Sequence, residues 1–144
     1  MRLPQDMLEM VSVTKDDVLY DLGCADGRLC VQCAKTCGVR CIGYELKPEE
    51  VLTAQEAVRR EGLEHLVEIK QGDLMEVDLT PATVIALCLT PWAINLLQDR
   101  LLESVERGAR VASYLWPVDM LAKYQTGTGK WNNMYFYSKK IIIQ

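Results

Sequence analysis

The stretch DLGCADGR, residues 21–28, follows the β-prone run Val18-Leu19-Tyr20 and leads into helix-compatible residues from Arg28 to Thr36. Glycine at positions 23 and 27 lets the backbone turn tightly beside a ligand, and a helix that starts there presents free N–H groups. Gly38 follows as a natural helix end. The stretch therefore predicts a strand, a glycine turn and a helix, which is the first unit of an α/β sheet.

The same alternation continues along the chain. We expect further strands over residues 39–45, 66–70, 83–89 and 110–115, and helices from Pro48 to Gly62 and from Trp92 to Arg107. Segment 83–89 is apolar throughout, as a strand buried on both faces requires. Parallel neighbours need crossovers that are usually helical. The pattern thus predicts an α/β fold with a mostly parallel sheet and helices on both faces.

The C-terminal segment, residues 131–144, is β-prone but carries Ser138-Lys139-Lys140 in its middle. We interpret it as one or two antiparallel strands at the C-terminal edge of the sheet, with Asn132-Asn133 in the approach turn. No repeat, low-complexity run or linker divides the chain. We therefore expect residues 1–144 to form a single domain.

Composition excludes several classes of protein. With 49% hydrophobic and 25% charged residues, the 144-residue chain has an ordinary globular composition. It contains neither an apolar run of ~18 residues nor a signal peptide, so we expect a cytoplasmic protein without a membrane span. The net charge of −4 makes nucleic acid an unlikely partner. Six cysteines in such a chain favour reduced thiols.

Residues suited to a ligand follow each of the first four predicted strands, where an open α/β sheet binds its ligands. Glu45, 18 positions after Gly27 (45 − 27), can accept hydrogen bonds from both hydroxyls of a ribose. Gly72-Asp73-Leu74 can hold an adenine by its amino group and its ring, and Leu89-Thr90-Pro91-Trp92 follows strand four. A dinucleotide-binding turn fits less well, because G-x-G-x-x-G would need glycine at Ala25 and Arg28.

The runs DLGCADGR, GYE, QGDL, LTPW and GARV together resemble the class I S-adenosyl-L-methionine (AdoMet) dependent methyltransferases. More narrowly, they resemble small bacterial methyltransferases related to the mitochondrial protein-lysine methyltransferases of ATP synthase c subunit and adenine nucleotide translocase. The resemblance extends from about Met7 to Trp116 and implies a Rossmann-like methyltransferase sheet. It also implies AdoMet as cofactor and S-adenosyl-L-homocysteine as product.

The resemblance assigns Asp21 and Gly23 to the methionine part of AdoMet, Glu45 to its ribose, Asp73 and Leu74 to its adenine, and Leu89 to its reactive side. The complete predicted cofactor site comprises Asp21, Gly23, Cys24, Ala25, Gly27, Glu45, Leu46, Gly72, Asp73, Leu74 and Leu89. Ala25 departs from the family's usual glycine; a positive φ there would cost about 1 kcal/mol or more. No residue is assigned a catalytic role, because alignment and desolvation can supply most of the rate of methyl transfer.

Our leading hypothesis is an AdoMet-dependent N-methyltransferase whose acceptor is a protein lysine. An acidic surface suits a lysine-bearing partner, although the oligomeric state stays open. Thr90-Pro91-Trp92 lacks the Asn/Asp-Pro-Pro-aromatic motif of enzymes that methylate adenine or glutamine. Two alternatives remain: an AdoMet-binding protein of the same fold without transferase activity, and a small-molecule methyltransferase.

Other residues that often carry chemistry are better explained by structure. Cys30-x-x-Cys33 has the spacing of metal ligands, but Cys30, Cys33 and Cys37 share one helix face, so we expect buried thiols and no metal site. His65 should lie in a solvated turn. We expect Trp131, Tyr135, Phe136 and Tyr137 to pack in the sheet rather than stack on a substrate. Trp92 could equally be a site residue or the first core residue of its helix.

Overall fold

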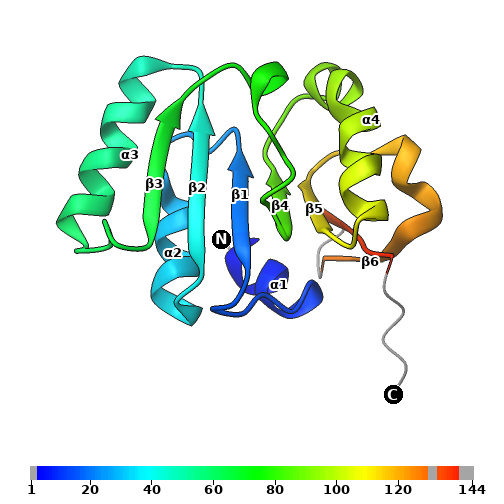
Figure 1. The fold of residues 1–144 in the computed structure, drawn as a ribbon, viewed down its shortest axis with the longest axis horizontal. Coiled ribbons are helices and arrows are strands. Elements are labelled where there is room, and N and C mark those ends of the chain that lie inside the picture. The colour runs from blue at the N-terminus through cyan, green and yellow to red at the C-terminus, as the bar shows by residue number, and fades with distance from the viewer. Residues whose placement is uncertain (1–2, 130–132, 140–144) are drawn as a thin grey trace.

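In the computed structural model, which describes residues 3–129 and 133–139, one sheet has the strand order β3-β2-β1-β4-β5-β7-β6 (Figure 1). The strands are β1 (Val18–Leu22), β2 (Arg40–Glu45), β3 (Val67–Gln71), β4 (Val84–Leu87), β5 (Arg110–Tyr114), β6 (Gln125–Thr128) and β7 (Met134–Tyr137). The helices are α1 (Leu3–Met10), α2 (Arg28–Cys37), α3 (Pro48–Arg60) and α4 (Pro91–Glu106), with the 3₁₀ turns η1 (Leu74–Glu76) and η2 (Asp119–Tyr124).

Strands β1 to β5 are parallel, and the chain changes direction across the sheet between β1 and β4. From β1 it moves outward through β2 to β3, and it then returns to place β4 and β5 on the other side of β1. The carboxyl ends of β1 and β4 therefore border the point at which the strand order reverses. This is the place where open α/β sheets bind their ligands.

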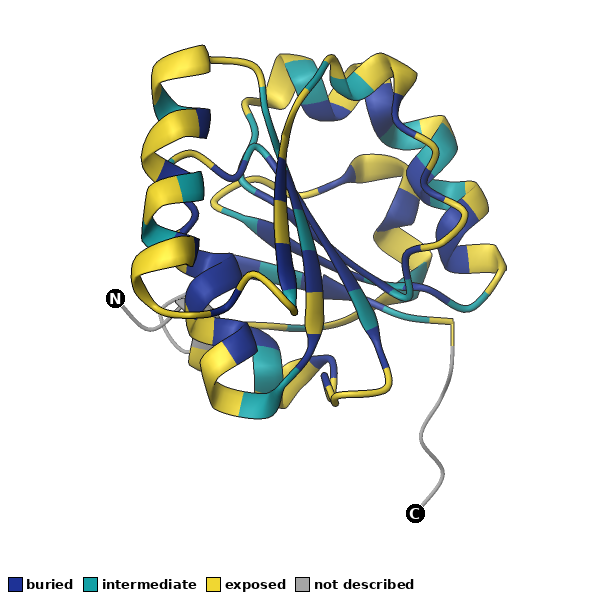
Figure 2. Ribbon diagram, turned by 60° about the vertical axis from the view of Figure 1, so that its left-hand side comes forward, coloured by how far each residue is buried: buried dark blue, intermediate teal, exposed yellow. Residues whose placement is uncertain are grey.

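Two apolar layers enclose the sheet, as the expected helices on both faces require. Helices α1, α2 and α3 cover one face, where Met7, Leu19 and Val39 are fully buried. Helix α4 and the two 3₁₀ turns cover the other, where Leu97, Leu101 and Leu121 fill the core. Figure 2 shows the resulting pattern, with buried residues concentrated in the strands and exposed residues on the outer sides of the helices.

The C-terminal part of the sheet differs from our expectation. Two antiparallel strands do form, but β6 lies in residues 125–128, before the expected segment, and it is the edge strand. Strand β7, with the sequence MYFY, is apolar and lies between β5 and β6. The physical reason is polarity: the largely exposed QTGT of β6 suits an edge, and buried Phe136 and Tyr137 suit an inner position. Trp131, Asn132 and residues 140–144 lie outside the described residues.

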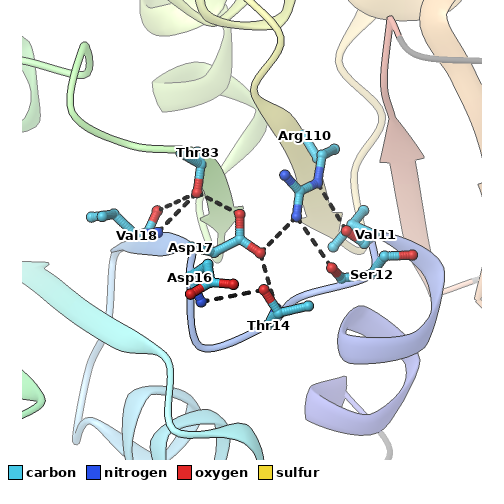
Figure 3. Close-up of polar contacts among 8 residues, drawn as sticks. All are labelled: Val11, Ser12, Thr14, Asp16, Asp17, Val18, Thr83 and Arg110. Carbon is cyan, nitrogen blue, oxygen red and sulfur yellow. Dashed lines mark hydrogen bonds and ion pairs between the residues drawn. The ribbon is translucent and has the colours of Figure 1, made fainter.

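A polar network ties the start of β1 to the starts of β4 and β5 (Figure 3). The Arg110 guanidinium donates to Asp17 Oδ2 at 2.8 Å and to the Val11 carbonyl at 2.9 Å, and Thr83 Oγ1 donates to Asp17 Oδ1 at 2.7 Å. Burial opposes ionisation of Asp17, but the hydrogen bonds outweigh it and lower the pKa of the carboxyl. Beside this network, a hollow of about 820 Å³ opens at the end of the strands opposite to the glycine loop.

Candidate functional site

The glycine loop, residues 23–27, lies across the carboxyl ends of β1, β2 and β4. The backbone N–H groups of Gly23 and Cys24 both donate to the Tyr44 carbonyl, at 2.9 and 3.0 Å. A Cβ on Gly23, whose φ is +82°, would lie 2.6 Å from the Cys88 carbonyl oxygen and 2.9 Å from Leu89 Cδ2. Only glycine fits there, since both the positive φ and the close approach of β4 exclude a side chain.

Ala25, which stands where the family usually has glycine, adopts a strained backbone conformation. Its φ is +47°, in the left-handed region. Its N–H donates to Glu45 Oε1 at 2.9 Å, while Leu46 and Lys47 donate their N–H groups to Glu45 Oε2 at 3.0 and 3.1 Å. The carboxylate at the end of β2 thus holds the loop in place and keeps lone pairs for further donors.

Asp21 is the most unusual titratable group of this edge. The residue is 1% exposed, and Oδ1 has no hydrogen-bond partner among the described residues. Its other oxygen accepts a weak hydrogen bond from Cys30 Sγ at 3.7 Å. Burial, with a smaller contribution from the charge of Glu45, raises the pKa of Asp21 to about 7. A buried acceptor without a donor is costly, so this site calls for a cationic or N–H-bearing ligand.

The loop after β3 supplies the third group of predicted residues. Gly72 donates its N–H to the Glu45 carbonyl at 3.2 Å, which brings this loop beside the end of β2. Asp73 is exposed, and its side chain accepts from the Met75 N–H at 2.9 Å, which caps the start of η1. Leu74 is half-buried and packs against the core cluster that α4 covers. Arg100 of α4 donates to carbonyls of this turn, including those of Leu74, Met75 and Val77.

The end of β4 leads directly into α4. Leu89 is half-buried beside Gly23, and Thr90 caps the helix by accepting from the Ala93 N–H at 3.2 Å. Trp92, in the first turn, is 74% exposed. The interpretation of Trp92 as the first core residue of its helix is therefore wrong, because the core positions of α4 begin at Ile94.

The structure brings the predicted residues together at one edge of the sheet, although not all in the same manner. Gly23 and Ala25 belong to the glycine loop, and Asp21, Glu45 and Leu89 lie next to it. The Cys24 side chain is buried against Gly43 of β2, so only its backbone can face a ligand. Gly27 is the N-cap residue of α2, but one N–H expected to be free there, that of Arg28, donates to Asp26 Oδ1 at 3.2 Å. Leu46 is exposed beside Glu45.

Of the cysteines expected to be buried thiols, Cys30 and Cys33 lie in the core, whereas Cys37 is only partly buried. Cys30 and Cys33 are fully buried, and Cys30 Sγ lies 2.7 Å from Cys41 Sγ. Among the residues that the structure describes, no group of three His, Cys, Asp or Glu side chains could hold a metal ion. His65 is exposed in a turn before β3. No helix in the described ranges is long and apolar enough to cross a membrane.

Sequence reasoning missed the turn after β5, residues 114–116. Leu115 has a φ of +70° and Trp116 is 46% exposed at the same edge of the sheet. Because residues 110–115 read as one continuous strand, nothing in their pattern signalled that the chain turns sharply at Leu115.

The strand order and the placement of this site define the class of protein. An RNA methyltransferase from Salinibacter ruber in complex with S-adenosyl-L-homocysteine has a similar structure, with a TM-score of 0.84 and 33% identity. The match covers 99% of this chain and 94% of that one. The fold is that of the S-adenosylmethionine-dependent methyltransferases. Residues 21–125 match the ANTKMT methyltransferase domain, and the chain belongs to that family.

Two relatives of this chain are named for lysine methylation. A protein-lysine N-methyltransferase of Saccharolobus islandicus (strain REY15A) is 34% identical over 109 residues, which are 75% of this chain and 68% of that protein. The adenine nucleotide translocase lysine N-methyltransferase of Mus musculus is 37% identical over 101 residues, 69% of this chain and 44% of that protein. The chain thus matches about two thirds of the Saccharolobus relative and less than half of the mouse one.

Proposed function

We propose that this chain binds AdoMet at the carboxyl edge of β1 to β4 and transfers its methyl group to the side-chain nitrogen of a protein lysine. The observation that carries the cofactor part is the buried Asp21 oxygen that has no donor in the described structure. The amino-acid end of AdoMet carries an ammonium, which is the kind of donor that this oxygen lacks. Lysine as the acceptor is supported by the two relatives named for lysine methylation.

The other residues fit the remaining parts of the cofactor. Glu45 accepts three backbone N–H groups and can still accept from a ribose hydroxyl. Asp73 and Leu74 offer a carboxylate and an apolar surface for the adenine. Gly23 leaves room for close approach of the methionine part, and Leu89 lies beside it. Cys24, Ala25, Gly27, Leu46 and Gly72 would contribute backbone and contact surface.

When bound, AdoMet supplies a methyl group on a positively charged sulfonium. The lysine nitrogen, as the neutral amine, forms a bond to the methyl carbon while the carbon–sulfur bond breaks. The electron pair of the broken bond stays on sulfur, which leaves S-adenosyl-L-homocysteine. The nitrogen takes over the positive charge and then releases a proton to solvent. The residues of the chain contribute by alignment and by excluding water.

Calorimetric titration with S-adenosyl-L-homocysteine tests the cofactor site. Removing the ribose acceptor in Glu45→Ala should weaken binding at least tenfold, a loss of about 1.4 kcal/mol. Glu49→Ala is the matched control, because Glu49 is an exposed carboxylate in the first turn of α3 and should leave affinity unchanged. Absence of heat with either AdoMet or S-adenosyl-L-homocysteine would refute the cofactor assignment.

RNA is the second candidate acceptor, because the similar Salinibacter protein, which this chain covers over 94% of its length, is described as an RNA methyltransferase. The net charge of −4 argues against it. Incubating the protein with cell extract and AdoMet labelled on its methyl group separates the candidates. Label that is released by protease and recovered as methyl-lysine supports our proposal, whereas ribonuclease-sensitive label supports RNA. Label found in small molecules supports a small-molecule methyltransferase. Absence of any label supports an AdoMet-binding protein without transferase activity.

A further inference from the structure

The turn after β5 is strained and is held in that conformation by its surroundings. Leu115 has a φ of +70°, and the Trp116 N–H donates to the Tyr114 carbonyl at 2.9 Å, which closes a three-residue γ-turn. For a residue with a side chain, such a conformation costs about 1–3 kcal/mol and persists only where other contacts enforce it. Strain of this kind clusters at functional sites.

Two further hydrogen bonds enforce the turn. The Leu115 N–H donates to the Asn133 carbonyl at 2.7 Å, and the buried Ser113 hydroxyl donates to the Trp116 carbonyl, also at 2.7 Å. The turn nevertheless leaves the side chains of Leu115 and Trp116 49% and 46% exposed. Core packing therefore does not explain why the chain maintains the strained turn.

A second exposed indole lies at the same edge. Strands β4 and β5 are paired so that Leu87 lies opposite Ser113. Trp116 follows Ser113 by three residues and Trp92 follows Leu87 by five, so both leave the sheet at its carboxyl edge. Leu89, three residues before Trp92, lies beside the glycine loop at Gly23. Because β4 and β5 are neighbours in the sheet, both indoles leave it on the β4–β5 side of the loop, where the resemblance places the reacting end of the cofactor.

We infer that Trp92 and Trp116 are substrate-binding residues that form an aromatic receptor for the acceptor's lysine amino group and its methylated product. This inference rests on the proposed lysine methyltransferase function. During the transfer the positive charge moves from sulfur to nitrogen, and each added methyl group removes an N–H from the product. The face of an indole attracts a cation without needing an N–H donor, so it suits the amine at every stage of methylation.

Binding of defined peptides tests the inference without needing the natural substrate. The probes are the peptide Gly-Ser-Xaa-Ser-Gly with trimethyl-lysine at Xaa and the same peptide with the uncharged tert-butyl isostere. Ligand-observed NMR measures both affinities, with the protein saturated by S-adenosyl-L-homocysteine and without it. We expect the wild-type protein to bind the charged peptide at least fivefold more tightly than its isostere.

The variants separate aromatic recognition from a merely apolar surface. Trp92→Leu and Trp116→Leu should each reduce the preference for the charged peptide to less than twofold, whereas Trp92→Phe and Trp116→Phe should retain most of it. Leu52→Ala, which removes an exposed apolar side chain from α3, should change nothing. The affinity for S-adenosyl-L-homocysteine should stay within twofold of wild type in all five variants.

Equal binding of the two peptides by the wild-type protein, or a preserved preference in both leucine variants, would overturn the inference. Neither result would touch the cofactor site, which the titration with S-adenosyl-L-homocysteine tests separately. Conversely, a protein that binds no S-adenosyl-L-homocysteine refutes the proposed function. The peptide titration without that ligand then still reports whether the two indoles recognise a cation.

Discussion

At the scale of single residues, the strain of Ala25 belongs to folding rather than to ligand binding. Its φ is +47°, and a contact within the chain holds it there, because its N–H donates to Glu45 Oε1 at 2.9 Å. The left-handed conformation is thus part of the fold, so we expect its cost to fall on folding stability. The alanine is therefore compatible with a working cofactor loop.

Ala25→Gly should accordingly raise stability without changing affinity. Relief of left-handed strain gains about 1–2 kcal/mol, and the greater freedom of glycine in the unfolded chain offsets about 0.5–1 kcal/mol of that. We expect urea unfolding to show a net gain of about 0.5–1 kcal/mol, with affinity for S-adenosyl-L-homocysteine within threefold of wild type. Ala57→Gly, inside α3, should instead lose about 1 kcal/mol. A tenfold gain in affinity would mean that the alanine methyl group obstructs the ligand.

At the scale of elements, the turn at residues 114–116 depends on partners from two directions. Asn133, which precedes β7, fixes its first half, and Ser113 at the end of β5 fixes its second half. The antiparallel pairing of β7 with β5 is what brings Asn133 into range. The position of the Trp116 indole is thus a property of the strand pair and not of the turn sequence.

Ser113→Ala should loosen this turn at a modest cost in stability. Losing one hydrogen bond costs about 1 kcal/mol, and the freed Trp116 carbonyl can reach water because the residue is half-exposed. The preference for the trimethyl-lysine peptide over its isostere should fall at least twofold, while affinity for S-adenosyl-L-homocysteine stays unchanged. Ser104→Ala, at an equally buried serine of α4 remote from the edge, should cost similar stability and keep the preference. If both variants keep it, the Ser113 bond does not position Trp116.

At the scale of the whole molecule, stability depends on pH through a buried carboxyl group of the candidate site. Burial raises the pKa of Asp21 to about 7 in the folded protein from 3.8 as the ordinary value. Between these values the unfolded chain loses its proton while the folded protein keeps it. The unfolded state is therefore favoured progressively as pH rises from about 4 to 7, and the loss is complete above the folded pKa.

Urea unfolding at pH 4 to 8 checks this dependence in wild type and Asp21→Asn. A shift of about three pKa units corresponds to a loss of up to about 4 kcal/mol in the wild-type protein at pH 8 relative to pH 4. The variant should lack this slope. The two proteins are compared by the slope of stability against pH, because the buried amide of asparagine changes the absolute stability at every pH. Only the slope reports the ionisation of Asp21. Asp99→Asn, at an exposed position, should keep the wild-type slope. Parallel curves for wild type and Asp21→Asn would contradict the raised pKa.

Local pattern was sufficient for most of the fold. Glycine and proline mark the ends of α2, α3 and α4, and the apolar run at residues 83–89 indicated the inner strand β4. These signals depend on neighbours along the chain, so they can be read without the tertiary structure. The edge position of β6 could not, because QTGT has a weak strand pattern and forms its ladder only with β7.

The sequence by itself determined the parallel α/β sheet and the set of residues at its carboxyl edge, because glycine geometry and hydrophobic periodicity act locally. Only the tertiary structure decided how those residues are arranged and paired. It showed that Glu45 holds the Ala25 N–H and that Asp21 has an unpaired buried oxygen. It also brought the exposed indoles of Trp92 and Trp116 to one edge. Burial, pKa and juxtaposition depend on segments that meet only when the whole chain folds.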